Sequence, residues 1–369
     1  MEIRPITKCR LCESQNLEQL LKLADIPLAD GYSKSPRESK LYPDELWLCR
    51  ECGHAQMGHM LNPEIMFTDY HFHSGDSPAF VEHLKQEGDD IVRRFSPKSV
   101  LEIGSNDETL LRHLARNVRI VQGVDPANVG GALTTRAFFT SQFAEDLNKK
   151  FDCVIANHVF AHADDLVDMV EGVRKCLSPN GVFVFENAYV LDLIRGAYYD
   201  QIYHEHPSYH SLKPLRKFFA SHGMELFDVD LNGCKGGSIR GFVQHKNGPH
   251  KTLKAKLAGV LWREEEWNIH RPDAFQCIPK RIKAQKKALP RGRLIGYGAA
   301  SSCTPVIYNL EIQDRLECLI DDNPRKQGLY SPGANIPVKA EMSGLPCVIL
   351  ALRYADAIKV KHPNAIRLP

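Results

Sequence analysis

Val100-Leu101-Glu102-Ile103-Gly104-Ser105-Asn106-Asp107 has the pattern of a buried strand that enters a glycine turn and opens a helix. Such a turn directs backbone N–H groups and a helix N-terminus at an anionic part of a ligand. A second apolar run, 118–124, is followed by Asp125, and a carboxylate there is suited to accepting hydrogen bonds from ribose hydroxyls. The two runs together predict a βα unit that binds a nucleoside-containing cofactor.

The pattern around this stretch predicts a parallel α/β sheet. Apolar runs of strand length alternate with amphipathic stretches, a pattern typical of that fold class. The expected strands are 99–103, 118–124, 152–156 and 181–185, and the expected helices are 108–115 and 165–177. Two more strand-like runs, 224–229 and 238–245, are separated by glycines and predict a hairpin at the edge of the sheet.

The two ends of the chain differ from this middle part. Residues 1 to about 75 are rich in Cys, Pro and Tyr and show no long helical period. A charged helical connector over 249–289 precedes three short buried runs, which predict a second, smaller α/β unit at 293–297, 316–320 and 347–351. We therefore expect three domains, with the bounds 1–75, 76–248 and 249–369.

Two cysteine pairs near the N-terminus have the spacing of a metal site: Cys9 with Cys12, and Cys49 with Cys52. Each C-x2-C turn presents two thiolates, and four thiolates suit a tetrahedral Zn²⁺. Redox pairs are the alternative, but a thioredoxin-like pair opens a helix after a strand and neither pair does. Because four protein ligands leave no position for water, the predicted zinc is structural.

Composition limits the possible partners. Hydrophobic residues make up 43% of the 369 residues and charged residues 25%, with a net charge of +2, as in an ordinary soluble protein. Acidic and basic residues are interspersed, so we expect no nucleic acid partner. No signal-like N-terminus and no run of about 18 apolar residues is present. We expect a cytoplasmic monomer that does not bind membranes.

The cofactor loop favours S-adenosylmethionine (SAM) over a nicotinamide. Asn106 and Thr109 stand where a G-x-G-x-x-G fingerprint has glycines, and Asp125 is followed by Pro126 and Ala127 as in class I methyltransferases. A structural turn without a ligand is the remaining alternative. The expected cofactor contacts are Glu102, Gly104, Ser105, Asn106, Asp107, Asp125, Pro126, Phe143, Ala144, Asn157 and His158.

A histidine-rich run follows the last parallel strand: Ile202-Tyr203-His204-Glu205-His206-Pro207-Ser208-Tyr209-His210. His162 follows the neighbouring strand and is expected at the same carboxyl edge of the sheet, where open α/β sheets bind ligands. A surface cluster without function and a catalytic metal site are two interpretations, although the run is not H-E-x-x-H. General acid/base machinery is favoured, because carbon methylation needs a base beside a carbonyl and support for the resulting oxyanion.

Further motifs occur in a fixed order along nearly the whole chain. Besides the stretches above they include Pro27-Leu28-Ala29-Asp30, Leu48 to Gln56, Tyr70 to Ser77, Tyr199 to His206, Gly236 to Arg240, Gly296 to Ala299 and Asp322 to Gly328. With these motifs the chain resembles the sugar C-methyltransferases of deoxysugar biosynthesis, which methylate C3 of nucleoside-diphosphate 4-keto deoxyhexoses. The resemblance implies a zinc-binding N-terminal domain, a class I methyltransferase core with a Rossmann-like fold, and a C-terminal Rossmann-like domain that closes over the sugar nucleotide.

The resemblance also assigns roles to individual residues. It implies that His206 is the base for the C3 proton, that Tyr203 or His162 bonds the C4 oxygen, and that Glu205 orients an imidazole. The implied substrate is a nucleoside-diphosphate keto sugar, and the methyl donor lies opposite the base, so the product has inverted configuration at C3. The expected substrate contacts are Tyr70, His204, Lys235 and Arg240.

Several positions depart from the family pattern. Glu108 replaces the final glycine of G-S-N-D-G and is expected to add charge near the methionine end of SAM. Glu186-Asn187-Ala188 replaces E-x-P, Ser301-Ser302-Cys303 replaces a common Lys-Gly after G-Y-G-A, and His210 stands at a usual aromatic position. The departures bear on sugar identity more than on the type of reaction.

Three other functions are compatible with parts of the sequence. The same fold can methylate oxygen or nitrogen of a sugar, which needs no carbon acid. A non-catalytic scaffold that binds zinc and SAM would not require the run from Tyr203 to His206. A nicotinamide enzyme would use Gly296-Tyr297-Gly298, but that turn has no evident acid for the ribose.

Overall fold

The structure is a computed structural model that describes residues 2–68, 72–341 and 344–369. Its largest sheet has seven strands in the order β12-β13-β10-β9-β6-β7-β8. Their bounds are β6 (Ser99–Ile103), β7 (Ile120–Asp125), β8 (Thr134–Arg136), β9 (Phe151–Asn157), β10 (Leu177–Ala188), β12 (Met224–Asn232) and β13 (Ser238–His245). The pairs from β10 to β8 are parallel, whereas β13 is antiparallel to both of its neighbours. The predicted α/β sheet and its edge hairpin are confirmed.

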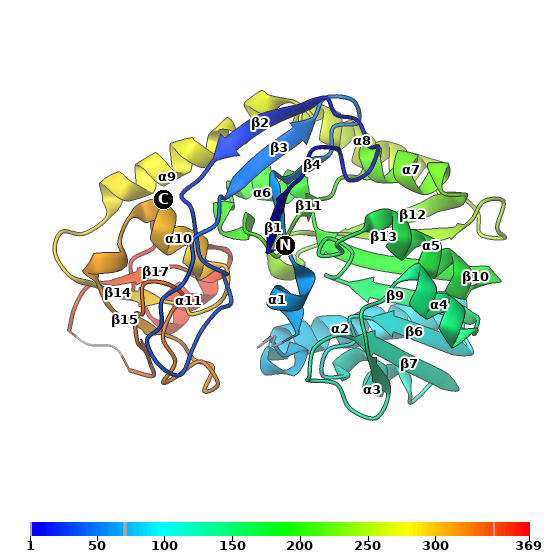
Figure 1. Cartoon of the computed structure of the whole chain (residues 1–369), viewed down its shortest axis with the longest axis horizontal. Coiled ribbons are helices and arrows are strands. Elements are labelled where there is room, and N and C mark those ends of the chain that lie inside the picture. Colours follow the sequence, from blue (N-terminus) through cyan, green and yellow to red (C-terminus); the bar gives the residue numbers. More distant parts are fainter. Residues whose placement is uncertain (1, 69–71, 342–343) are drawn as a thin grey trace.

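Helices pack on this sheet (Figure 1). The predicted helices correspond to α3 (Thr109–Leu114) and α5 (Leu166–Cys176), and the structure adds α4 (Ser141–Leu147), α6 (Val190–Gly196) and α7 (Leu212–Ser221). The 18-residue helix α2 (Pro78–Phe95) was not predicted. Its buried face contains Leu84 and Ile91, and also Glu87 and Gly88. Because Glu87 and Gly88 are not apolar side chains, they interrupt the apolar period that would have indicated a helix.

The N-terminal region forms a small sheet with the order β11-β4-β3-β2. Its strands are β2 (Leu17–Lys22), β3 (Glu45–Cys49), β4 (Ala55–Met57) and β11 (Ser208–Tyr209), and β1 (Ile3–Pro5) pairs separately with β5 (His59–Leu61) ahead of α1 (Pro63–Phe67). Strand β11 belongs to the histidine-rich run. The run therefore closes one edge of the N-terminal sheet and ties that sheet to the part of the chain that forms the seven-stranded sheet.

The C-terminal region forms a parallel sheet with the order β16-β15-β14-β17. Its elements are β14 (Leu294–Tyr297), α10 (Cys303–Leu310), β15 (Leu316–Ile320), β16 (Val338–Lys339), β17 (Cys347–Ile349) and α11 (Ala355–Lys361). The predicted connector contains α8 (Lys254–Glu266) and α9 (Cys277–Ala288). In Figure 1 these yellow helices run along one side of the molecule, past the blue N-terminal sheet, between the two α/β units.

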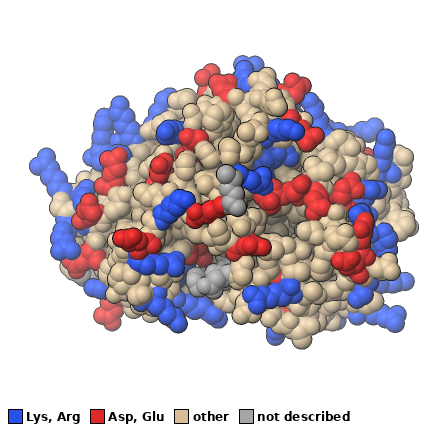
Figure 2. Space-filling view, in the orientation of Figure 1, with Lys and Arg blue, Asp and Glu red and all other residues tan. Residues whose placement is uncertain are grey.

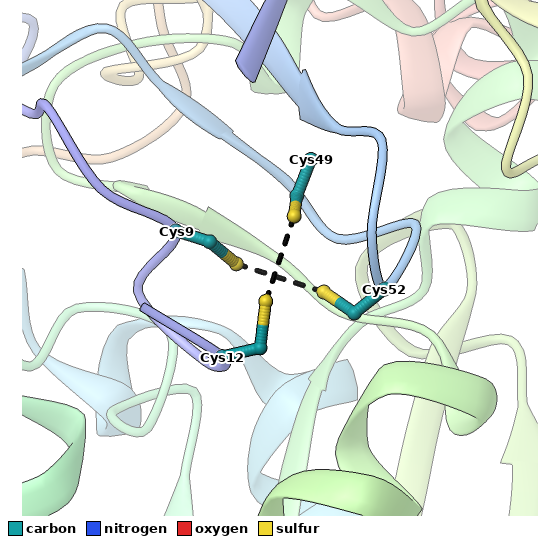
Figure 3. A group of neighbouring side chains, drawn as sticks. All are labelled: Cys9, Cys12, Cys49 and Cys52. Carbon is teal, nitrogen blue, oxygen red and sulfur yellow. Dashed lines mark hydrogen bonds between the residues drawn. The ribbon is translucent and has the colours of Figure 1, made fainter. Parts of the chain in front are cut away.

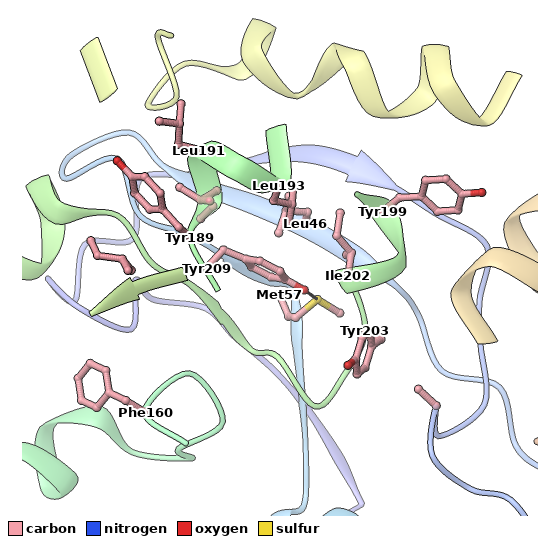
Figure 4. Close-up of a cluster of buried hydrophobic side chains, with 14 of the residues drawn as sticks. Leu46, Met57, Phe160, Tyr189, Leu191, Leu193, Tyr199, Ile202, Tyr203 and Tyr209 are labelled. Atoms are coloured by element: carbon pink, nitrogen blue, oxygen red, sulfur yellow. Dashed lines mark hydrogen bonds between the residues drawn. The ribbon is translucent and has the colours of Figure 1, made fainter. Parts of the chain in front are cut away.

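A buried cluster of aliphatic and aromatic side chains joins these parts (Figure 4). Tyr209 lies within it, and its hydroxyl is 3.6 Å from the sulfur of Met57 on β4. On the face shown in Figure 2, acidic and basic side chains are interspersed. Among the described residues no helix is both long and apolar enough to cross a membrane.

Candidate active site

The four cysteines of the two N-terminal pairs converge on one point (Figure 3). The Sγ atoms of Cys9 and Cys52 are 3.6 Å apart, as are those of Cys12 and Cys49. A tetrahedral zinc with Zn–S bonds of about 2.3 Å needs sulfur atoms about 3.8 Å apart, so the geometry fits the metal. This is a structural zinc site, because the four thiolates complete its coordination.

The turn after β6 has the geometry expected of a cofactor loop. Gly104 adopts a φ of +73°, and its N–H donates to the Val124 carbonyl at 2.7 Å. The Asp125 carboxylate at the end of β7 accepts hydrogen bonds from the N–H groups of Asn106 (2.9 Å) and Ala127 (2.8 Å). Asp125 therefore organises the loop, in addition to the ribose contact predicted for it.

Two polar atoms at the carboxyl edge of the sheet are buried without a hydrogen-bond partner among the described residues. They are Glu102 Oε2 on β6 and Asn157 Oδ1 on β9. Burial also raises the pKa of Glu102 well above its usual value. Orphaned buried acceptors are costly unless a ligand satisfies them. These atoms fit a cofactor such as SAM, whose amino and hydroxyl groups can donate to them.

The loop side chains also hold the segment that precedes α2. Asn106 Nδ2 donates to the Phe72 carbonyl (3.0 Å), and Asn106 Oδ1 accepts from Ser74 N (2.9 Å). Asp107 Oδ2 accepts from Gly75 N at 2.7 Å. Asn106 and Asp107 thus fix the segment beside the loop. Tyr70, which was predicted to contact substrate, lies outside the described residues.

The remaining predicted cofactor residues follow strands β6, β7 and β9 or lie on α4. Ser105 Oγ is 2.9 Å from Thr134 Oγ1, and the Pro126 carbonyl accepts from Arg136 at 3.4 Å. On α4, Ala144 is buried, and the half-buried ring of Phe143 packs against Phe139. His158 follows β9 with a φ of +54°, and its Nε2 is 3.3 Å from Glu186 Oε1.

The Glu108 carboxylate was predicted to add charge near the methionine end of SAM, but it bonds other groups of the protein. It accepts from Leu133 N at 2.8 Å and lies 3.1 Å from the Arg112 guanidinium. The residue adopts a φ of +65°, in the region that favours glycine, which gives a physical reason for glycine at the position. Its charge is compensated by Arg112 and supports the loop after β7 instead of the methionine end of SAM.

Three of the predicted catalytic side chains lie together. The ring centroids of His162 and His206 are 4.9 Å apart, and those of Tyr203 and His206 are 4.3 Å apart. His206 Nδ1 is 2.9 Å from the Gln201 carbonyl oxygen, and His162 Nδ1 is buried without a partner among the described residues. The Tyr203 hydroxyl is 3.4 Å from Ser301 Oγ, in the C-terminal region.

Burial sets the protonation states of these groups. Burial lowers the pKa of His206 to about 3 and holds the pKa of His162 well below its usual value. Burial also raises the pKa of Tyr203 above its usual value. At neutral pH the site therefore combines neutral imidazoles, which can accept a proton, with a protonated phenol, which can donate a hydrogen bond.

The other polar residues of the histidine-rich run point elsewhere. His204 Nε2 bonds the Pro43 carbonyl at 3.0 Å, and the His210 ring stacks on Phe160 with centroids 5.2 Å apart. The substrate contact of His204 stays a prediction. No hydrogen bond from Glu205 to an imidazole is found among the described residues. Burial and the neighbouring Asp30 carboxylate raise the pKa of Glu205 to about 8. The orienting role of Glu205 stays a prediction.

The two cations predicted to contact substrate differ in their partners. Arg240 pairs with Glu186 (2.7 Å) and Glu87 (3.2 Å), both buried carboxylates, and its substrate contact stays a prediction. Lys235 lies in the 3-10 turn η3 (Cys234–Gly236) between β12 and β13. Arg353, which sequence reasoning missed, donates to the Lys235 carbonyl at 2.8 Å from the C-terminal region. No local sequence signal links these two residues.

Models of known families match three successive segments. They are described as "Putative zinc binding domain" (residues 9–67), "Methyltransferase domain" (80–229) and "C-methyltransferase C-terminal domain" (233–365). The chain is 28% identical over 362 residues to the C-methyltransferase NovU of Streptomyces niveus, covering 91% of this chain and 86% of that protein. These likenesses support the zinc and SAM assignments and the general activity of SAM-dependent C-methylation.

Two of the solved structures that align with this chain are methyltransferases, and each covers less than half of it. The magnesium protoporphyrin IX methyltransferase ChlM of Synechocystis PCC 6803 with bound SAH is 16% identical, with a TM-score of 0.34 over 44% of this chain and 84% of its own. An S-adenosylmethionine-dependent methyltransferase from Clostridium acetobutylicum is 12% identical, with a TM-score of 0.37 over 46% of this chain and 92% of its own. At these TM-scores no conclusion is drawn from the alignments.

Proposed function

We propose that this SAM-dependent methyltransferase transfers a methyl group to a carbon atom next to the ketone of a nucleotide-linked keto sugar. The observation that carries the proposal is the cluster of His162, Tyr203 and His206 beyond the strand ends that carry the cofactor loop. Methyl transfer to oxygen or nitrogen has less need of a buried base, whereas transfer to carbon requires one. The likeness to the C-methyltransferase NovU supports transfer to carbon.

His206 acts as the base in this proposal. Because its Nδ1–H donates to the Gln201 carbonyl, the lone pair lies on Nε2, which removes the proton next to the ketone. The same hydrogen bond stabilises the imidazolium that forms. SAM, when bound, supplies the electrophilic methyl group. The chain's own contribution is to hold the carbon acid, the base and the donor loop in one arrangement that excludes water.

Tyr203 and His162 act on the ketone oxygen as it gains charge. The Tyr203 phenol is protonated, and its hydroxyl lies near Ser301 in the C-terminal region. His162 has a buried nitrogen without a partner among the described residues, so it can bond a substrate oxygen. Donors aimed at a developing oxyanion typically contribute about 10²–10³-fold to kcat. We further propose that the methyl donor and His206 lie on opposite faces of the sugar, which gives inversion.

The C-terminal region, residues 249–369 in this proposal, binds the nucleotide part of the substrate. Its contacts with the site through Ser301 and Arg353 support that role. A binding scaffold would not need the unpartnered nitrogen of His162 next to His206.

The test is a panel of dTDP-, CDP- and GDP-linked keto sugars incubated with enzyme and SAM. We expect a product heavier by one methylene whose NMR spectrum shows a new methyl group on carbon next to the ketone. A methyl group on oxygen or nitrogen would replace the proposal with heteroatom methylation. A panel of sugars without the ketone is the matched control and should give no product.

A further inference from the structure

The Lys235 backbone is held in an unfavourable conformation. Its φ is +48°, and it is followed by Gly236 and Gly237, which also have positive φ. A left-handed conformation costs a non-glycine residue of order 1–3 kcal/mol and persists where the surroundings enforce it, often at functional sites. Here Arg353 Nη1 donates to the Lys235 carbonyl at 2.8 Å, and Arg353 Nε is 3.0 Å from Asp200 Oδ2.

The Lys235 ammonium has no carboxylate partner among the described residues. Its Nζ lies 4.4 Å from the centroid of the Phe80 ring and 4.9 Å from that of Phe72. Cation–π contacts of this kind orient a cation but do not neutralise it. The charge of Arg353, in contrast, is compensated by the buried Asp200. Of Lys235 and Arg353, Lys235 is thus the cation without a carboxylate partner among the described residues.

The charged and titratable groups around Lys235 come from three sides. Cys234 is its neighbour in η3, Glu186 belongs to β10, and Arg353 belongs to the 3-10 turn η6 (Leu352–Tyr354). Burial, together with the Arg353 charge, lowers the pKa of Lys235 to about 8, although Cys234 and Glu186 act in the opposite direction. At neutral pH the ammonium form predominates.

Gln201 links Lys235 to the proton-transfer cluster: its Nε2 donates to the Lys235 carbonyl at 3.5 Å, and its own carbonyl accepts from His206 Nδ1 at 2.9 Å. The positive charge of Lys235 lowers the pKa of both His206 and His162, and Arg353 acts on His206 in the same direction. The Lys235 charge keeps the His206 imidazole neutral. Burying this charge without a partner costs free energy, and an anion nearby would offset that cost. In the proposed reaction one anion does appear beside His206, namely the enolate oxygen formed when the proton leaves.

We propose that Lys235 is a catalytic residue whose ammonium group binds the enolate oxygen of the substrate as that oxygen gains charge. This inference rests on the proposed function and adds a cationic group to Tyr203 and His162. The His206 imidazole takes the proton from carbon, and the electron pair of the broken C–H bond moves into the enolate. Lys235 neutralises the oxygen, and the electron pair then forms the new bond to the methyl group as the bond between that methyl group and the sulfonium sulfur of the donor breaks, with its electron pair left on sulfur.

The test compares Lys235→Met, which removes the charge, with Lys235→Arg, which keeps it, and with the exposed-surface control Lys217→Met on α7. We expect Lys235→Met to lower kcat by about 10²–10³-fold with the sugar KM within about threefold of wild type. The kcat of Lys235→Arg should be at least tenfold higher than that of Lys235→Met, and Lys217→Met should behave as wild type. The SAM Kd and the melting temperature should be unchanged in all three variants.

The pH profile separates a catalytic from a merely structural role. Since the active form is the ammonium, kcat should fall as pH rises through about 8 in the wild type. That limb should move to higher pH in Lys235→Arg. A raised sugar KM with unchanged kcat in Lys235→Met would contradict the inference and assign the cation to an anion of the ground state, such as the diphosphate. If the wild type itself methylates no keto sugar at carbon, the proposed function fails.

Discussion

The Nδ1 atom of His206 lies 2.9 Å from the carbonyl oxygen of Gln201. The carbonyl can only accept, so His206 must donate from Nδ1 and present its lone pair at Nε2. The imidazole therefore has a fixed tautomer as well as a fixed orientation. Because the Gln201 carbonyl is a backbone group, side-chain substitution at Gln201 leaves this hydrogen bond in place.

The zinc site should determine stability more than catalysis. Purified protein should contain about one zinc per chain by elemental mass spectrometry. Cys49→Ser should lose the metal and melt well below wild type, because a structural zinc contributes its binding free energy to folding. Cys277→Ser is the matched control, since that thiol lies in α9 and bonds the Ile194 carbonyl. Unchanged zinc content and melting temperature in Cys49→Ser would contradict the assignment.

Asp125→Ala should weaken SAM binding by roughly 10-fold to 150-fold, the equivalent of losing about 1.5–3 kcal/mol from a charge-assisted hydrogen bond. It should also lower the free energy of unfolding by roughly 1–3 kcal/mol, because two backbone N–H groups lose their acceptor. Calorimetric titration and chemical denaturation measure the two effects.

The variant Asp152→Ala separates the loss of SAM affinity from the loss of stability. Asp152 accepts from the N–H groups of Lys98 (2.8 Å) and Ser99 (3.2 Å), at the start of β6 and away from the cofactor loop. Its loss should cost similar stability and leave SAM affinity unchanged. Equal SAM affinity in wild type and Asp125→Ala would remove Asp125 from the cofactor site.

The protein should lose stability steeply in mild acid. Six histidines have pKa values lowered chiefly by burial: His54, His204 and His210, which are buried, and His158, His162 and His206, which are partly buried. A histidine whose pKa is lower in the folded state favours folding above its unfolded pKa of about 6.5. That contribution is lost as pH falls from there toward about 4 or 3, the pKa values of His204 and His206.

His210→Phe gives this prediction a matched variant. Both ring nitrogens of His210 are unbonded among the described residues, and the ring stacks on Phe160. Phenylalanine can keep the stacking and remove one titrating group. The slope of unfolding free energy against pH near pH 5 should fall by about 1.4 kcal/mol per pH unit. A stability that is flat between pH 8 and pH 5 in the wild type would contradict the account.

The sequence predicted the parts of the fold that depend on local pattern. Strand β6 and the hairpin strand β13 have the predicted bounds, since Gly104 follows the first and Gly237 precedes the second, and both glycines mark turns. Helix α2 was missed because Glu87 lies on its buried face, where Arg240 compensates its charge. No pattern within α2 reveals a partner on β13.

Contacts between distant parts of the chain also limit what the sequence indicates about the site. His204 and His206 are two residues apart, yet one bonds Pro43 of the N-terminal region and the other faces His162. Which imidazole enters the site depends on strand β11 pairing with β4, a long-range contact. Arg353 likewise reaches Lys235 through the packing of the C-terminal unit, across more than a hundred residues of chain.

Hydrogen exchange at the carbon next to the ketone tests the central claim most directly. The keto sugar is incubated with enzyme in deuterated water without SAM, and deuterium is followed by NMR. Wild type and His204→Asn should exchange this hydrogen, whereas His206→Asn should be slower by about 10²–10⁴-fold while still binding SAM and sugar. Rapid exchange in His206→Asn, or none in the wild type with bound ketone, would contradict the assignment of His206 as the base for carbon methylation.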